Sequence, residues 1–156
     1  MLKKISLRTT VLGYFHLETP DGFGVAAKVM KDANCEFPLL EILQRLKSRG
    51  VERSLIQRLQ NECITYLDTL QTRHENGEPI SPANGVLVSL KILGNLEAFP
   101  SVYLYSEGKK LCEAALDLRS SEAPYPFLAQ LRDAYGNMQL SQIKALMQAN
   151  PRGLDF

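Results

Sequence analysis

The chain has 156 residues, a formal net charge of +1, 45% hydrophobic residues and 22% charged residues. This size and balance are typical of one globular domain over residues 1–156 with a substantial core, and they exclude a largely disordered chain. The charge excludes a general attraction to nucleic acid or anionic lipid, and no apolar run approaches the roughly 20 residues that a membrane-crossing helix needs.

The first predicted element is a β-hairpin over residues 4–31. Apolar or β-branched residues alternate with others from Ile5 to Val11, which is the period of a half-buried strand. A turn signal follows at Thr19-Pro20-Asp21-Gly22, and alternation resumes from Phe23 to Lys31. An isolated hairpin is marginally stable, so this one needs further strands or a covering helix.

Two helices are predicted next, over about 37–48 and over 52–73. The second is the longest segment with a single period, because its apolar residues recur at steps of three and four. The members of this stripe are Ile56, Leu59, Cys63, Tyr66 and Leu70. Gly50 and Asn76-Gly77 follow the two helices and are typical stop signals.

The segment 78–106 supports two interpretations. Ser81-Pro82 would suit the start of a helix that continues through Leu96. Against this, apolar and β-branched residues alternate over 86–93, and 101–106 is rich in β-formers. We favour two strands that form a second hairpin, and the choice between strand and helix at 86–93 stays open.

Three helices are predicted in the remainder, over 110–119, from about residue 125 or 126 to Tyr135, and from an N-cap at Ser141 to Asn150. The predicted order is therefore β-β-α-α-β-β-α-α-α. Short connections and hairpin-paired strands favour an α+β fold, in which a small antiparallel sheet of two hairpins packs against about five helices.

The cysteines indicate a reducing compartment. Cys35, Cys63 and Cys112 are odd in number and widely spaced, and Cys63 lies within the apolar stripe. Buried free thiols of this kind are typical of cytoplasmic proteins, whereas a disulfide framework needs paired cysteines. Cys35 has acidic neighbours rather than the cations that activate a nucleophilic thiolate.

No set of residues in the sequence amounts to a reaction. His16 and His74 are the only histidines, and neither stands at metal-ligand spacing from a cysteine or from the other histidine. No phosphate-binding glycine pattern occurs at a strand-to-helix junction. The sequence therefore predicts no metal site, no cofactor and no enzyme activity.

One charged cluster stands out at the junction of the first two predicted helices. Its members, which we call the basic corner, are Arg45, Lys47, Arg49, Arg53 and Arg58. Glu52 is the one acidic residue within 44–58. A helix-turn-helix-like corner of this charge would suit a nucleic-acid backbone or an acidic partner, although the second helix is longer than a usual recognition helix.

These features predict a cytoplasmic, non-catalytic protein that acts through protein–protein contacts, as an adaptor, an inhibitor or an assembly factor. Tyr103 and Tyr105 are candidate interface residues, because tyrosine is enriched in interfaces. The alternative is a nucleic-acid-binding protein that uses the corner 45–58. The sequence leaves the identity of the partner open, and it neither requires nor excludes a homo-oligomer.

Overall fold

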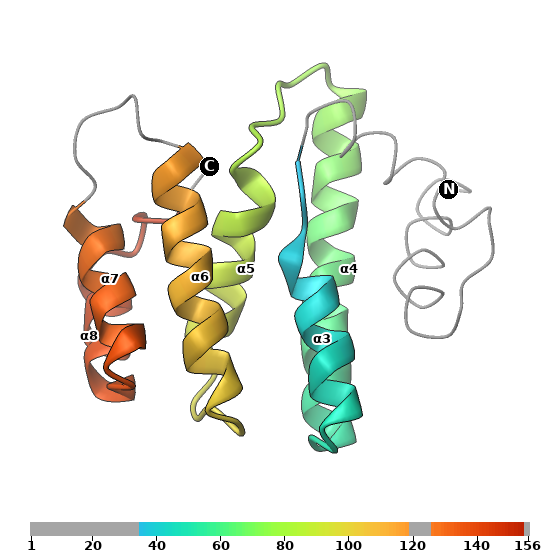
Figure 1. The fold of residues 1–156 in the computed structure, drawn as a ribbon. Coiled ribbons are helices and arrows are strands. Elements are labelled where there is room, and N and C mark those ends of the chain that lie inside the picture. The colour runs from blue at the N-terminus through green and yellow to red at the C-terminus, as the bar shows by residue number, and fades with distance from the viewer. Residues whose placement is uncertain (1–34, 119–125, 155–156) are drawn as a thin grey trace. The chain divides into compact units, whose positions relative to one another are not determined.

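A computed structural model describes residues 35–118 and 126–154 of the chain (Figure 1). The chain divides into two compact units, Met1–Pro82 and Ala83–Phe156, which are described separately below. The helices, labelled as in Figure 1, are α3 (Pro38–Ser48), α4 (Arg53–Glu75), α5 (Asn84–Gly94), α6 (Tyr103–Leu118), α7 (Pro126–Gly136) and α8 (Leu140–Ala149).

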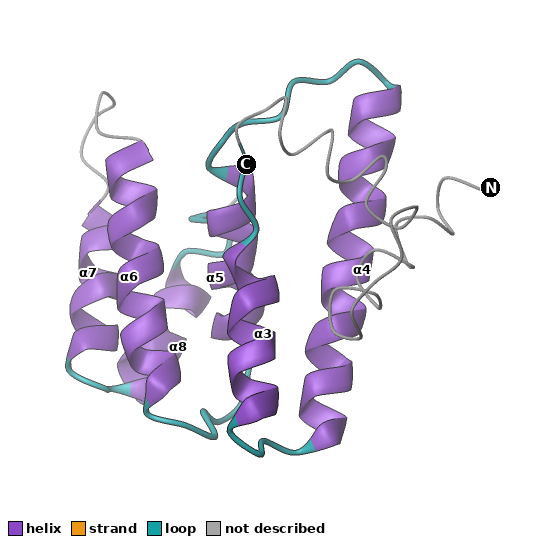
Figure 2. Cartoon of the chain, turned by 45° about the vertical axis from the view of Figure 1, so that its right-hand side comes forward, coloured by secondary structure: helices purple, strands orange, loops and turns teal. Residues whose placement is uncertain are grey.

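The prediction of an α+β fold is wrong for the described residues, which form helices and loops without any strand (Figure 2). The second predicted hairpin does not exist, because 86–93 lies inside α5 and most of 101–106 lies inside α6. The first predicted hairpin, over 4–31, lies outside the described residues.

In the first unit, the two predicted helices are confirmed as α3 and α4, which lie against one another. The whole predicted stripe of α4 is buried, and Ile64 and Leu67 are buried beside it. The apolar face of α4 is therefore wider than a narrow seam, as expected of a helix in a globular core. Phe37 packs edge-to-face on Tyr66 with ring centroids 4.8 Å apart, which ties the start of α3 to the middle of α4.

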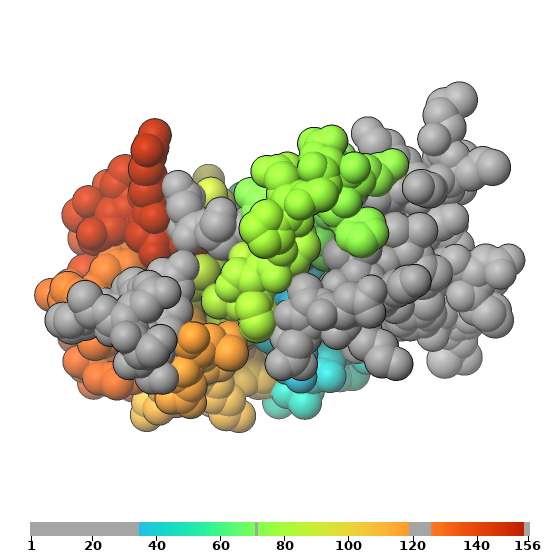
Figure 3. All heavy atoms as spheres, turned by 90° about the horizontal axis from the view of Figure 1, so that it is seen from above, coloured from blue at the N-terminus to red at the C-terminus, as the bar shows by residue number. Residues whose placement is uncertain are grey.

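Both helices of the first unit end where the glycine signals predict. Gly50 has a φ of 77°, and its N–H donates to the carbonyl oxygen of Lys47 at 3.2 Å. The N–H of Val51 donates to the carbonyl oxygen of Leu46 at 3.3 Å, which completes a Schellman motif. The same pattern closes α4 around Gly77, with a φ of 74°, and leads into the largely exposed loop 76–82, seen in green in the top view of Figure 3.

The second unit contains α5, α6, α7 and α8, which run alternately in opposite directions (Figure 1). α6 packs against α5 and α7, and α8 packs against α7 and α5, so the contacts close a ring of four helices. This is the arrangement of an up-and-down helix bundle joined by short connections.

The strand prediction at 86–93 failed because α5 is buried on nearly every side. Every residue of α5 except Lys91 is buried, so the segment lacks the polar face that reveals a helical period. Its alternating β-branched residues then resembled a strand. Ser89, which interrupts the apolar run, is accommodated because its hydroxyl donates to the carbonyl oxygen of Gly85 at 2.6 Å.

The strand prediction at 101–106 overlooked a helix start at Ser101. The Oγ of Ser101 accepts a hydrogen bond from the backbone N–H of Tyr103 at 3.2 Å, and its carbonyl accepts one from Leu104 at 3.1 Å. This is N-cap geometry, which outweighs the β-propensity of the residues that follow. The helix predicted from residue 110 is therefore the second half of α6.

A glycine and a tyrosine form a close contact between α6 and α7. Gly108 lies in the buried face of α6, against the buried ring of Tyr135 from α7. A Cβ at this glycine would overlap Cδ1 and Cε1 of that ring. Phe99 stacks on the same ring with centroids 5.9 Å apart, so the tyrosine ring contacts both α6 and the connection that precedes it.

The connection from α7 to α8 uses a left-handed residue that is not glycine. Met138 has a φ of 53°, and its N–H donates to the carbonyl oxygen of Tyr135 at 3.0 Å. The next N–H, from Gln139, donates to the carbonyl oxygen of Ala134 at 3.0 Å, which again completes a Schellman motif. α8 then begins at Leu140, so the predicted N-cap at Ser141 is wrong by two residues.

Substitutions at Gly50 and Met138 are expected to change stability in opposite directions. Gly50→Ala should lower the free energy of unfolding by about 1 kcal/mol, because an L-residue is strained at positive φ. Nothing lies within 4 Å of the added Cβ, so steric overlap contributes nothing. Met138→Gly should raise the free energy of unfolding by roughly 0.5 kcal/mol, after the greater unfolded-state entropy of glycine is deducted. Urea unfolding of both variants measures these changes in the free energy of unfolding. If both variants changed stability in the same direction, the conclusion that positive φ strains a non-glycine residue at these two positions would be contradicted.

Candidate functional site

The basic corner lies where α3 turns into α4. The Schellman motif at Gly50 fixes the turn, and the hydroxyl of Ser48 donates to the carbonyl oxygen of Arg45 at 2.9 Å. Because the helices on both sides pack together through Leu46 and other buried residues, the corner is carried on a rigid pair of helices. A support of this kind spares a binding surface the cost of ordering its backbone, although the side chains still lose conformational entropy.

All five predicted side chains of the corner are exposed. Arg45 and Arg49 point away from the core of the first unit, which is formed on α3 by leucine and isoleucine side chains. Glu52 precedes α4 as its N-cap residue without a side-chain capping bond, and the first turn of α4 holds no acidic residue. The corner therefore adjoins both the negative end of the α3 dipole and the positive end of the α4 dipole, so its positive charge comes from the side chains themselves.

The two candidate interface tyrosines lie in the second unit, on the first turns of α6 rather than on a strand. Both are half-buried. The hydroxyl of Tyr103 donates to Oε1 of Glu107 at 2.6 Å, and the ring of Tyr105 lies 4.9 Å from that of Phe99, centroid to centroid. The structure thus gives both side chains contacts inside the second unit.

The cysteines of the described residues are free and buried thiols. Burial raises the pKa of Cys63 far above its usual value, with Glu62 adding to the effect. Burial also raises the pKa of Cys112 to about 12, although Arg132 opposes this shift and Glu113 adds to it. Neither of these two thiols carries the low pKa of a catalytic nucleophile, which depends on thiolate at neutral pH.

Of the two histidines, His74 lies among the described residues. His74 is exposed in the last turn of α4, where a cation is favoured by the helix dipole. His16 lies outside the described residues. Within 35–118 and 126–154, no three His, Cys, Asp or Glu residues gather in a group that would hold a metal ion.

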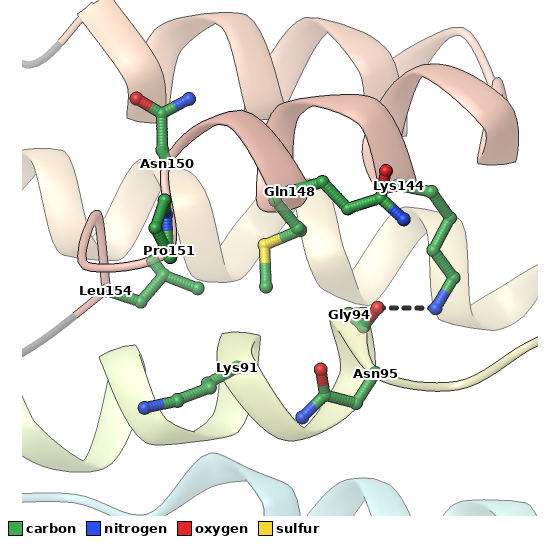
Figure 4. A pocket seen from close by; sticks show the side chains of 9 residues that line it. Lys91, Gly94, Asn95, Lys144, Gln148, Asn150, Pro151 and Leu154 are labelled. Carbon is green, nitrogen blue, oxygen red and sulfur yellow. Dashed lines mark hydrogen bonds between the residues drawn. The ribbon is translucent and has the colours of Figure 1, made fainter.

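Sequence reasoning missed a cleft in the second unit, between the last turn of α5 and the C-terminal half of α8 (Figure 4). Its volume is about 310 Å³. The lining residues are Lys91, Gly94, Asn95, Lys144, Met147, Gln148, Asn150, Pro151 and Leu154. They come from segments about 50 residues apart, so the cleft depends on the packing of α5 against α8 and carries no local sequence signal.

A lysine of α8 stabilises one end of the cleft. Nζ of Lys144 donates to the carbonyl oxygen of Gly94 at 2.7 Å, as the dashed line in Figure 4 marks. This carbonyl belongs to the last turn of α5, whose carbonyl groups carry partial negative charge and favour a cation. The bond therefore caps α5 and also brings an ammonium group to the cleft.

No helix among the described residues combines the length and the apolar character that a membrane crossing requires. Comparison with protein-family models, with curated proteins and with solved structures finds no match for the chain.

Proposed function

We propose that the protein is a non-catalytic binding protein of the cytoplasm, an adaptor, inhibitor or assembly factor that contacts an acidic partner protein through the basic corner. The observation that carries the proposal is the exposure of all five cations around one two-helix turn, in a segment 44–58 whose one acidic residue is Glu52. The buried free thiols support the compartment, because unpaired cysteines are typical of proteins kept in reducing conditions.

An acidic protein suits the corner better than a nucleic acid for two reasons. The chain has a net charge of only +1, so the chain as a whole lacks the long-range attraction that drives nucleic-acid binding. The helix that follows the turn has 23 residues, whereas helix-turn-helix proteins place a short recognition helix in the major groove.

Nucleic acid is the second candidate, because four of the five cations are arginines. The guanidinium group presents two parallel donors to a phosphate and is preferred over lysine wherever phosphate geometry is recognised. In that case the corner would contact the sugar–phosphate backbone rather than read base sequence.

Charge reversal at the corner is expected to abolish partner binding without unfolding the protein. The test variant is Arg49→Glu with Arg53→Glu, and the control is Lys109→Glu with Arg152→Glu, which makes the same change in net charge at exposed residues of the second unit. Each tagged protein is used to capture partners from an extract of the source cells, with and without nuclease. We expect the corner variant to recover at least about tenfold less of one defined protein, whereas the control recovers wild-type amounts.

Three outcomes decide between the candidates. Recovery of a protein that survives nuclease treatment and is lost only in the corner variant supports the proposal. Recovery that disappears with nuclease supports the second candidate, and equal recovery by both variants contradicts both. Thermal unfolding should agree within about 0.5 kcal/mol among the proteins, because all four substitutions are at exposed positions.

A further inference from the structure

The dipeptide Asn-Gly occurs twice in the chain, in two contrasting environments. Asn76-Gly77 follows the last turn of α4, and both residues are exposed. Asn84-Gly85 begins α5, and both residues are buried, with Asn84 only 1% exposed. In Asn-Gly the asparagine side chain reacts readily with the backbone, because glycine has no side chain to obstruct the nitrogen that follows asparagine. The two copies therefore place the same chemistry in two different surroundings.

This reaction needs no reagent other than water. The backbone nitrogen of the glycine attacks Cγ of the asparagine, and the bond from Cγ to Nδ2 breaks. The glycine nitrogen gives up its proton and Nδ2 leaves as ammonia, so a five-membered succinimide ring remains. Water then opens the ring at one of its two carbonyls, which gives aspartate or isoaspartate. Either product carries a carboxylate in place of a neutral amide, so one event lowers the net charge of the chain from +1 to zero.

The folded turn has to open before the ring can close at Asn76. The N–H of Gly77 donates to the carbonyl oxygen of His74 at 3.1 Å, and Asn76 has a ψ of 0°, where the glycine nitrogen eclipses the asparagine nitrogen rather than its side chain. Opening breaks this bond and the bond from the N–H of Glu78 to the carbonyl oxygen of Arg73 at 2.9 Å. A Cβ at Gly77 would meet no atom within 4 Å beyond its chain neighbours, so the moving turn displaces no packed group. Exposed helix ends of this kind open at a low free energy.

The same movement at Asn84 requires part of the second unit's core to unpack, because α5 is buried on nearly every side. The N–H of Leu87 donates to the carbonyl oxygen of Ala83 at 2.9 Å, which holds the first turn of α5 around Asn84 and Gly85. The carbonyl oxygen of Gly85 also accepts a hydrogen bond from the hydroxyl of Ser89 at 2.6 Å. Opening a buried helix costs a large share of the stability of the whole unit.

From this contrast we propose that Asn76 is a site of spontaneous deamidation in the folded protein, and that α5 protects Asn84 from the same reaction. The product carboxylate lies at the C-terminal end of α4, where the helix dipole disfavours negative charge. Isoaspartate also lengthens the main chain within the Schellman motif at Gly77, because its backbone runs through Cβ and Cγ. The end of α4 therefore loosens as the protein ages. This site is separate from the basic corner, which lies at the opposite end of α4.

The test is peptide mapping by mass spectrometry after the folded protein has been kept for several weeks in mildly alkaline buffer. Trypsin cleavage after Arg73 and Lys91 releases both asparagines on one peptide, and fragmentation assigns a gain of one dalton to either position. Digestion in heavy-oxygen water marks any conversion that occurs during preparation. We expect at least about tenfold more conversion at Asn76 than at Asn84, because the two positions differ in the free energy of opening. Equal conversion, or more conversion at Asn84, would overturn the proposal.

Unfolding in urea separates the effect of the fold from that of local sequence. The unfolded chain should convert both asparagines at similar rates, because each precedes a glycine. If Asn84 is also the slower position in urea, then α5 is not what protects it. If Asn76 stays intact in the folded protein while the unfolded chain converts, then the turn after α4 does not open and the proposal fails.

A variant assigns the change of charge to one residue. Asn76→Gln is at an exposed position, so it should fold as the wild-type protein does, and its longer side chain cannot form the five-membered ring. Ion-exchange chromatography of the aged proteins should show an acidic species that accumulates in the wild-type protein and falls at least about fivefold in the variant. Equal amounts in the two proteins would place the reaction at another residue and overturn the assignment.

Discussion

Replacing Gly108 by alanine is expected to lower the free energy of unfolding by about 2 kcal/mol. The new Cβ would overlap the ring of Tyr135, which is almost fully buried and also stacks with Phe99, so little space is left for it to move. Overpacking of this kind costs up to about 3 kcal/mol, and the better helix propensity of alanine returns about 1 kcal/mol of it. Urea unfolding of the variant and of the wild-type protein measures the difference.

Two further variants separate steric overlap from backbone effects. Gly136→Ala, at the end of α7, places a Cβ at an ordinary 3.6 Å from Cδ of Lys109, and we expect a change within about 0.5 kcal/mol. Tyr135→Leu removes the ring that the new Cβ would overlap. In this background, Gly108→Ala should lower the free energy of unfolding by at least about 1 kcal/mol less than it does in the wild-type protein. If Gly108→Ala is as stable as Gly136→Ala, then α6 and α7 do not approach as described.

The helices that the sequence predicted correctly are those with one solvent-exposed side. α3 and α4 bury one face each, so their apolar residues keep a period of 3.6 and their polar residues fill the other face. Their ends were also predictable, because a chain that leaves a helix through positive φ favours glycine, and Gly50 and Gly77 adopt that conformation.

The element that the sequence could not identify is the one buried nearly all round. In α5 the exposed residue is Lys91 alone, so period-3.6 patterning is absent and local β-propensity decided the prediction wrongly. α6 was predicted only from residue 110, because the buried Gly108 and Glu107 weakened the helical pattern of its first half. The glycine has a tertiary cause, because Gly108 admits the ring of Tyr135 from α7. The burial of Glu107 is accompanied by a local bond, because it accepts a hydrogen bond from Tyr103 four residues earlier in the same helix.

The same distinction applies to the two candidate sites. The basic corner is local in sequence, so its exposure on adjoining helix ends followed from the placement of α3 and α4. The cleft is assembled by Gly94 and Lys144, which are far apart in the chain, and by a helix that had been predicted as a strand. Sequence spacing carries no information about such a pair until α5 and α8 are placed against one another.

The protein is expected to lose stability steeply above pH 9. Burial raises the pKa of Cys63 and Tyr66 in the first unit, where the Cys35 thiol adds to the effect on the tyrosine. In the second unit burial raises the pKa of Cys112 to about 12 from a usual 9.0, and it also raises the pKa of Tyr135. Each unit therefore carries one thiol and one phenol that must stay protonated in the folded state.

The direction of this pH dependence follows from the number of protons that the folded and unfolded states bind. Between pH 9 and the raised pKa the folded protein keeps a thiol proton that the unfolded chain has already released, so the free energy of unfolding falls as pH rises. Each such group contributes a slope of up to about 1.4 kcal/mol per pH unit, and the phenols add theirs above about pH 10. With one thiol and one phenol, a unit should lose up to roughly 3 kcal/mol per pH unit above pH 10, a large part of a typical total stability of 5–15 kcal/mol.

Urea unfolding at successive pH values between 8 and about 11, in the presence of a reductant, measures this slope directly. Cys112→Ala provides the control, because it removes the thiol contribution of the second unit while the first unit keeps Cys63. The variant should begin less stable at pH 8, since a buried side chain is truncated, and should then lose less stability than the wild-type protein from pH 9 to 10. Equal losses in the two proteins would show that the Cys112 thiol is not shielded from water, and the packing of α6 around it would have to be revised.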